Sequence, residues 1–202
     1  MIYLNRNCGV KQLADIKEKE IIENQEQSKK KDSQKGSLFK ELVIDIVIVL
    51  VIGFSVWKFI GYGVWITSGS MIPTLGVKDR LIVSRVHNTN NLNYGDIVLF
   101  KNEEYDNDIL IKRLIGKSGD KIEIKNGILY RNGELIKEPY VKNNENYDNV
   151  FEVPENKFFF LGDNRPNSAD SRYWKNPYVD SKNIEGKAIF RYYPFNEIGS
   201  LN

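Results

Sequence analysis

Hydrophobic and polar positions divide the chain into three parts. Residues 1–41 are polar and rich in lysine and glutamate, so we expect a tail that is largely disordered because it has little surface to bury. From Leu42 to Ile66 the chain is apolar almost throughout, with Asp45 and Lys58 as the charged exceptions. Residues 63–202 carry short apolar or alternating runs between turn residues, a pattern typical of β-strands.

The apolar run predicts one transmembrane α-helix over residues 42–62. A bilayer core needs roughly 20 mostly apolar residues, and this run supplies them if Asp45 and Lys58 lie near its two ends. A buried core helix or a pair of strands is the alternative, since the uncharged run from Ile46 to Trp57 is short and rich in β-branched residues. A cleaved signal peptide fits less well because the polar leader is long and no A-x-A site follows.

Charges beside this run predict its orientation. Five lysines lie in residues 29–40, whereas the next basic residue after Lys58 is Lys78. The excess of positive charge before the span predicts a cytoplasmic N-terminus and an extracytoplasmic C-terminal domain, as in a single-pass protein of the plasma membrane. The whole chain has 29 basic and 27 acidic residues, a balance that gives no reason to expect nucleic acid as a partner.

The C-terminal part is predicted to be a mainly β domain. Asn126-Gly127 and Asn132-Gly133 each separate two short runs, and Asn-Gly is the preferred pair for a two-residue hairpin turn. These turns predict a meander over residues 121–137. The expected strands are Arg80–Val86, Asp96–Phe100, Ile109–Ile115, Lys121–Lys125, Ile128–Arg131, Lys157–Leu161 and Ala188–Tyr193.

Composition restricts the chemistry. One cysteine, Cys8, excludes an internal disulfide framework, and one histidine, His87, argues against a metal site built from imidazoles. We therefore expect neither a metal nor a cofactor. His87 lies in an asparagine-rich stretch that is typical of a surface loop, which argues against a Ser/His/Asp triad.

Ser70 and Lys112 are the candidate reactive pair. Ser70 is followed by apolar residues and by Pro73, although its Ser-Gly-Ser setting is also that of a flexible linker. A serine needs a base, and lysine is a known one. Desolvation among apolar strand neighbours can lower the pKa of Lys112 from about 10.4 to about 8, at a cost of roughly 3 kcal/mol. Alternatively, Lys112 and Arg113 are charges that protect an edge strand.

A third informative stretch, residues 162–174, follows an apolar run and combines acids, arginines and serines with Tyr173 and Trp174. Together with Ser68-Gly-Ser70-Met-Ile-Pro-Thr-Leu75, Gly95-Asp-Ile-Val-Leu-Phe100 and Lys112-Arg113-Leu-Ile-Gly116, it carries a resemblance. The chain resembles the type I signal peptidases of bacteria, in their short Gram-positive form, over about residues 37–202. That family implies a signal-peptidase-like coiled β-sheet or barrel, a Ser/Lys dyad, and preprotein signal peptides and the lipid bilayer as partners.

The resemblance implies roles for individual residues. Ser70 is the expected nucleophile and Lys112 the general base, while Ser68 helps the Ser70 amide to stabilise the oxyanion and Ser168 orients the lysine amine. Arg113 with Asp163, and Asp170 with Arg172, are expected to form supporting ion pairs. The substrate is expected to bind as an added strand and to be cut after an Ala-x-Ala type site. The residues expected to contact it are Ile66, Met71 and Ile111.

Three other classes of protein are alternatives to this resemblance. Penicillin-binding and class A β-lactamase enzymes also combine serine with lysine, but the order of Lys117-Ser-Gly119 and Ser181-Lys-Asn183 is the reverse of theirs. A self-cleaving repressor has a DNA-binding head where this chain has its apolar run. An anchored β domain that binds a partner without catalysis is the non-enzymatic alternative.

Overall fold

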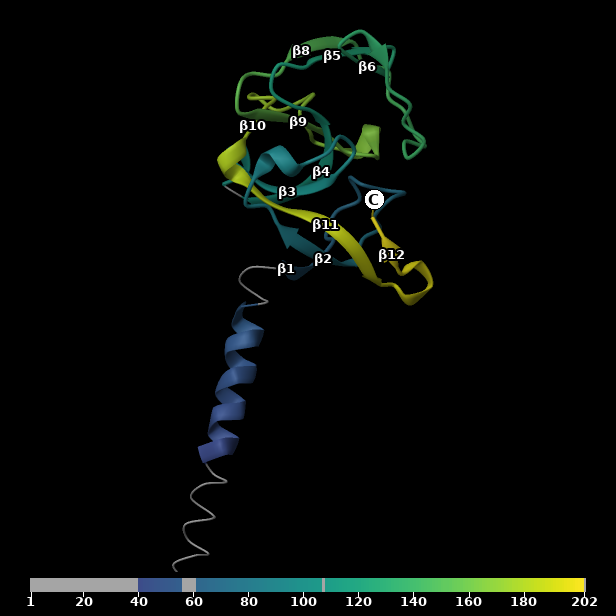
Figure 1. Ribbon diagram of the computed structural model, residues 1–202. Helices are drawn as coiled ribbons and strands as arrows, with labels where there is room; N and C mark the ends of the chain where they lie inside the picture. The colour runs from purple at the N-terminus through teal and green to yellow at the C-terminus, as the bar shows by residue number, and fades with distance from the viewer. Residues whose placement is uncertain (1–39, 56–60, 107, 202) are drawn as a thin grey trace, which may run out of the picture. The chain divides into compact units, whose positions relative to one another are not determined.

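The computed structural model describes residues 40–55, 61–106 and 108–201, and it divides the chain into the units Met1–Ser55 and Val56–Asn202 (Figure 1). In the first unit, residues 40–55 are helical. Within the described residues, no helix has the length and apolar character needed to cross a membrane. The expected tail up to residue 39, and residues 56–60 of the expected span, lie outside the described residues. The helix exposes the apolar side chains of Leu42, Val43, Ile44, Ile46, Val47, Ile48, Val49, Leu50, Val51, Ile52 and Phe54.

The second unit contains a large antiparallel sheet. Its strands follow the order β1-β2-β11-β3-β4-β9-β10, with β12 beside β11. Their bounds are β1 Gly61–Trp65, β2 Arg80–Arg85, β3 Ile97–Asn102, β4 Asp108–Gly116, β9 Lys157–Leu161, β10 Val179–Asp180, β11 Ile184–Tyr193 and β12 Gly199–Ser200.

A smaller antiparallel sheet has the order β7-β6-β5-β8, and Figure 1 shows it as a separate layer beside β9 and β4. Asn126, Gly127, Asn132 and Gly133 all have positive φ, so the two predicted Asn-Gly turns and the meander are confirmed. Its strands are β5 Lys121–Lys125, β6 Ile128–Arg131, β7 Glu134–Leu135 and β8 Asn149–Glu152, and short 3₁₀ helices are η1 Thr89–Asn91, η2 Glu103–Tyr105, η3 Arg165–Asn167, η4 Ser181–Asn183 and η5 Phe195–Glu197.

The prediction of a mainly β domain is confirmed, with one change at its beginning. Strand β1 starts at Gly61, so Gly61 and Tyr62 belong to the sheet and not to the end of a helix. The physical reason is pairing, because the five residues of β1 lie opposite Ser84 to Arg80 of β2 in a regular antiparallel register.

Three clusters of buried side chains form the core. One lies around Phe100 and Phe160, whose rings stack at 4.3 Å between centroids. A second contains Met71 and Leu75 with residues from β2 and β3. The third joins the smaller sheet to β9 through contacts such as Phe151 with Phe159.

Strand β4 changes partners along its length. It pairs with β3 from Asp108 to Arg113, and with β9 on its other side from Arg113 to Gly116. Residues 108–112 therefore have an open edge on the side away from β3. Because β1 is the terminal strand of the sheet, it also has an open edge.

Candidate active site

The turn that carries Ser70 is held by backbone bonds and by the core. Ile66 N–H donates to Asp79 O at 2.8 Å, Lys78 N–H donates to Ile66 O at 2.8 Å, and Leu75 N–H donates to Met71 O at 2.9 Å. The Met71 and Leu75 side chains are fully buried. This segment is therefore a packed turn and not a flexible linker, and Ser70 itself is buried.

Strand β4 delivers Lys112 to that serine. Lys112 Nζ donates to Ser70 Oγ at 2.8 Å and to Ile111 O at 3.1 Å. The lysine side chain is 4% exposed, and this desolvation lowers the pKa of Lys112 from 10.5 to about 8. The carboxylates of Asp170 and Asp163 raise the pKa of Lys112, but they do not offset the desolvation.

A groove of about 900 Å³ lies beside the pair and is bounded by β1 and by residues 108–112 of β4. These two segments stand first and fifth in the strand order, so the large sheet curls to bring their open edges to one groove. Ile66 and Ile111 both line it. Met71 does not line it, and the expectation that Met71 contacts substrate is corrected: its side chain is fully buried in the core. Ser68 lines the same groove, and its Oγ lies 3.4 Å from Ser70 Oγ.

The loop after β9 forms both expected ion pairs, one with Arg113 of β4 and one within the loop. Arg113 Nε donates to Asp163 Oδ1 at 2.8 Å, and its Nη2 lies 2.5 Å from Asp163 Oδ2. Arg172 Nε donates to Asp170 Oδ1 at 2.8 Å, and Asp170 also accepts from the Gly162 N–H at 2.9 Å. Both pairs are buried and doubly bonded, so they fix the loop beside the lysine.

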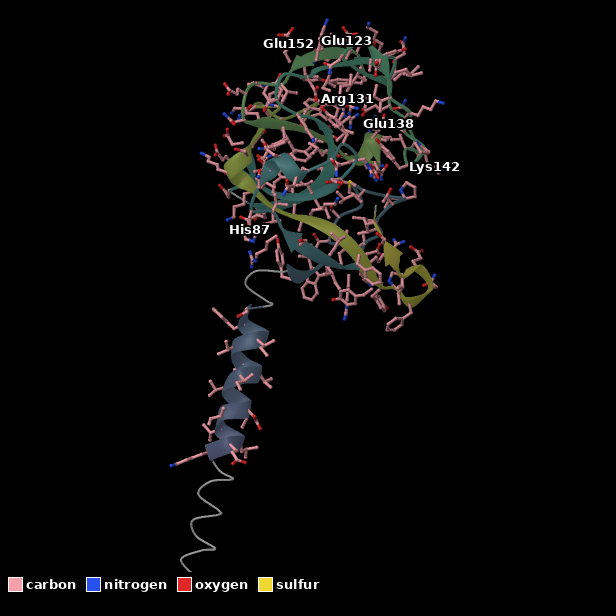
Figure 2. All side chains as sticks on the ribbon, in the orientation of Figure 1. His87, Glu123, Arg131, Glu138, Lys142 and Glu152 are labelled. Carbon is pink, nitrogen blue, oxygen red and sulfur yellow. The ribbon has the colours of Figure 1, made fainter. Side chains whose placement is uncertain are left out.

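The loop is also tied to the connection between β7 and β8. Arg165 Nη2 lies 2.6 Å from Glu138 Oε1, and Figure 2 shows Glu138 on that connection. The guanidinium of Arg113 lies 3.9 Å from the centre of the Tyr140 ring, close enough for a cation–π contact. The connection between β7 and β8 thus contacts both the loop and Arg113.

Comparison with known proteins decides the family. The family model described as "Signal peptidase, peptidase S26" matches residues 39–193. The chain belongs to the peptidase S26 signal peptidases. This membership makes it a serine endopeptidase of signal-peptide processing.

Two relatives with similar sequences support this family assignment. The chain is 36% identical over 167 residues to signal peptidase I of Leptolyngbya laminosa, covering 78% of this chain and 80% of the relative. It is 35% identical over 170 residues to signal peptidase I S of Bacillus subtilis, covering 78% and 90%. A crystal structure of a signal peptidase I from Enterococcus faecalis matches 48% of this chain and 96% of its own, with 34% identity and a TM-score of 0.43.

Ser168 differs from the sequence-based expectation in its contacts. In this S26 signal peptidase its hydroxyl is buried and has no hydrogen-bond partner among the described residues. The expected hydrogen bond to the Lys112 amine is therefore not formed in this structure. Ser168 nevertheless lies at the site, because a Cβ added to Gly162 would meet Ser168 Oγ at 2.1 Å and Ser70 O at 2.6 Å.

Two residues of the signal peptidase site were not singled out from the sequence. Gly162 allows the loop to approach both serines, as those distances show. Asn164 donates from its backbone N–H to Ser70 O at 3.0 Å and from Nδ2 to Gly69 O at 2.9 Å. A glycine directly after a buried strand is a signal of close approach, but nothing in the sequence indicates where the Asn164 amide binds.

His87 lies apart from the signal peptidase site. It is exposed, and Figure 2 shows it beside the larger sheet, just beyond the end of β2. Among residues 40–55, 61–106 and 108–201, no group of three or more His, Cys, Asp or Glu side chains has the arrangement of a metal site.

Proposed function

We propose that Ser70 and Lys112 form the catalytic dyad with which this enzyme cuts signal peptides from exported preproteins. The observation that carries the proposal is the 2.8 Å contact between Lys112 Nζ and Ser70 Oγ, made by a buried amine. With a pKa of about 8, Lys112 is neutral in a useful fraction of molecules near neutral pH. A neutral amine can accept the serine proton, which a lysine with its ordinary pKa cannot do at that pH.

The reaction proceeds in two halves. Lys112 Nζ takes the proton from Ser70 Oγ while Oγ attacks the carbonyl carbon of the last signal-peptide residue, position −1. The tetrahedral intermediate collapses, and the amine returns the proton to the leaving nitrogen of the mature protein. Lys112 then takes a proton from a water molecule that attacks the acyl-enzyme carbonyl. As the bond to Ser70 Oγ breaks, the amine gives this proton to Oγ, and the signal peptide leaves with a new carboxylate.

The neighbouring hydroxyls have two different roles in this proposal. The negative oxygen of the intermediate is stabilised by the Ser70 N–H together with the Ser68 hydroxyl, whose 3.4 Å separation from Ser70 Oγ supports such a role. Ser168 orients the lysine amine when substrate is bound. A buried hydroxyl without a partner is costly, and Ser168 is one, so it is ready to make that bond.

The four charged residues of the supporting pairs act through the loop and not on the substrate. Arg113 with Asp163, and Asp170 with Arg172, bury their charges in paired form. Removing one partner leaves an unpaired charge in the interior, which costs stability. Their role in this proposal is to hold the loop that contains Ser168 against the dyad.

The substrate lies in the groove as an extended strand. Support comes from the open edges of β1 and of residues 108–112, which offer unpaired backbone groups on both sides of the groove. A chain segment added there satisfies them by β-augmentation. Ile66 and Ile111 line the groove next to the dyad, leaving room for small side chains at positions −1 and −3 and thereby favouring Ala-x-Ala.

We also propose that the enzyme is a single-pass protein of the plasma membrane. Residues 42–60 are the span, residues 1–41 form a cytoplasmic tail, and residues 61–202, beginning with β1, form the extracytoplasmic protease domain. The helix at 40–55 supports this because apolar side chains cover all its sides. The excess of lysine before it supports the orientation.

An aromatic patch on the β domain further supports a position at a lipid surface. Trp65 and Phe195 are 73% and 78% exposed. Arg80 links them, because it pairs with Trp65 across the strands and lies over the ring of Tyr193, which contacts Phe195. Aromatic side chains with a nearby cation are typical of the headgroup region.

Two substitutions test the dyad. Ser70→Ala removes the nucleophile and Lys112→Met removes the base while keeping an unbranched side chain. Each is expected to abolish cleavage of a purified preprotein with an Ala-x-Ala site, measured by mapping the new N-terminus. His87→Ala is the control and is expected to keep the wild-type rate. Wild-type cleavage by Ser70→Ala or Lys112→Met would falsify the proposal.

A further inference from the structure

Asn164 forms hydrogen bonds with two consecutive peptide groups of the turn that carries Ser70, which we call the nucleophile turn. Its Nδ2 donates to Gly69 O at 2.9 Å, and its backbone N–H donates to Ser70 O at 3.0 Å. The contact with Gly69 joins residues 95 positions apart in the sequence. One residue of the loop after β9 thus fixes the carbonyl groups on both sides of the Ser70 α-carbon.

The bond to Gly69 O also fixes the Ser70 N–H. Both groups belong to the same peptide unit, which is planar, and only the Ile72-Pro73 and Tyr193-Pro194 bonds are cis among the described residues. In a trans peptide the C=O and the N–H point in opposite directions. A donor that holds Gly69 O on one side therefore directs the Ser70 N–H toward the other.

The Ser70 N–H has no acceptor among the described residues. The amide that constrains it is itself well fixed, because Asn164 is 9% exposed and its Oδ1 accepts from Asn167 Nδ2 at 3.4 Å. That second bond is consistent with Nδ2, not Oδ1, facing the Gly69 carbonyl. A hydrogen bond donated to Gly69 O also polarises the peptide, which strengthens its N–H as a donor.

We propose that Asn164 is a positioning residue that aims the Ser70 N–H at the oxyanion of the tetrahedral intermediate. The inference rests on the proposed function, because it takes Ser70 as the nucleophile. It assigns to the Asn164 side chain a contribution that appears only when negative charge develops on the substrate oxygen. Substrate binding in the ground state does not depend on it.

Asn164→Ala tests the proposal, since it deletes the side-chain bond and leaves the backbone bond to Ser70 O in place. We expect kcat for an Ala-x-Ala peptide to fall about 10- to 100-fold, less than or comparable to the loss of a whole oxyanion donor. KM should stay within about twofold, as uniform binding is unaffected. Asn176→Ala is the matched control, an exposed asparagine whose contact is to the Tyr178 N–H, and it should keep the wild-type kcat.

Two further measurements separate positioning from general damage to the fold. A peptide aldehyde ending in Ala-x-Ala forms a tetrahedral adduct with the serine, and its affinity should fall by the same factor as kcat in Asn164→Ala. The affinity of an uncleavable peptide with proline at position +1 should not change. The midpoint of the pH–rate profile should also stay in place, because Asn164 makes no hydrogen bond to Lys112.

The outcomes distinguish this inference from the dyad. If Asn164→Ala keeps the wild-type kcat while Ser70→Ala is inactive, Asn164 is not a positioning residue and the dyad stands. Equal losses of affinity for the aldehyde and for the proline peptide would mean a damaged groove, and they also overturn the inference. If Ser70→Ala is itself active, the proposed function fails first.

Discussion

The Lys112 amine makes its hydrogen bonds to Ser70 Oγ and to the Ile111 carbonyl, and its side chain is almost completely buried. Neither partner carries a charge that stabilises an ammonium ion. Burial therefore governs its protonation, and the pKa of Lys112 falls to about 8. The low pKa of this residue follows from its burial among apolar neighbours.

The first prediction at this scale concerns the rate. Because the proposed mechanism needs the unprotonated amine, kcat/KM for an Ala-x-Ala peptide should rise with pH through a midpoint at about 8 and then level off. The measurement is a pH–rate profile from about pH 6 to pH 10, with unfolding monitored in parallel. A profile that is flat over this range contradicts a lysine base.

The free energy of unfolding should also depend on the protonation of Lys112. The pKa of Lys112 is lower in the folded state than its ordinary value of 10.5, so between about pH 8 and pH 10.5 the unfolded chain binds more protons and the free energy of unfolding rises with pH. Below pH 8 the full desolvation cost is present. Lys112→Met should therefore be more stable than wild type at pH 7, by about 1–3 kcal/mol.

Urea unfolding at several pH values measures this difference. The advantage of Lys112→Met should shrink as the pH rises toward 10.5, because the wild-type amine then becomes neutral in both states. If the stability difference between Lys112→Met and wild type does not change with pH, the protonated amine of Lys112 does not destabilise the folded state at pH 7.

At the scale of elements, the loop after β9 approaches the nucleophile turn so closely that only glycine fits at position 162. Gly162→Ala brings a Cβ within 2.1 Å of Ser168 Oγ and 2.6 Å of Ser70 O. We expect a loss of roughly 1–3 kcal/mol in the free energy of unfolding and a fall in kcat of at least about tenfold, since displacing the turn misplaces the serine.

Gly199→Ala is the control for this substitution. Its added Cβ meets no atom within 4 Å, and its φ is outside the positive range. Thermal unfolding and peptide cleavage by Gly199→Ala should match the wild type. A Gly162→Ala variant that behaves like Gly199→Ala shows that the loop can move away without cost.

The elements were predictable to different degrees. Alternation and the Asn-Gly pairs located β5 and β6 at their observed bounds, because a hairpin is specified by residues close in sequence. Strand β1 was not predicted, since its apolar residues continue the run from Leu42 and its identity depends on pairing with β2. The packed turn at Ser70 depends likewise on distant partners, such as Asn164.

At the scale of the whole molecule, the site is assembled from three separate segments. Ser70 and Lys112 are 42 positions apart, and the loop that fixes them follows β9. No local sequence pattern indicates that these segments meet. From the residues alone, the pairing of Ser70 with Lys112 was therefore one hypothesis among several. The family motifs supplied the pairing, whereas the contacts of Ser168 and Asn164 required the fold.

The proposed arrangement across a membrane is also testable at this scale. Protease added to cells stripped of their wall should digest the domain at residues 61–202, and an epitope fused to the N-terminus should become accessible only after the membrane is opened. Immunoblotting for each end gives the result. An N-terminal epitope that is digested in intact cells contradicts the cytoplasmic tail.

The curled sheet with its two open edges has one more consequence. A substrate segment can form hydrogen bonds with β1 and with residues 108–112 only when its own backbone amides are not already hydrogen-bonded. A segment that is part of a helix or of a folded domain therefore cannot bind there. Recognition in this groove thus depends on the backbone conformation of the substrate as well as on its side chains. The proposed binding mode therefore implies that the residues around the cut site must be extended when the enzyme cleaves them.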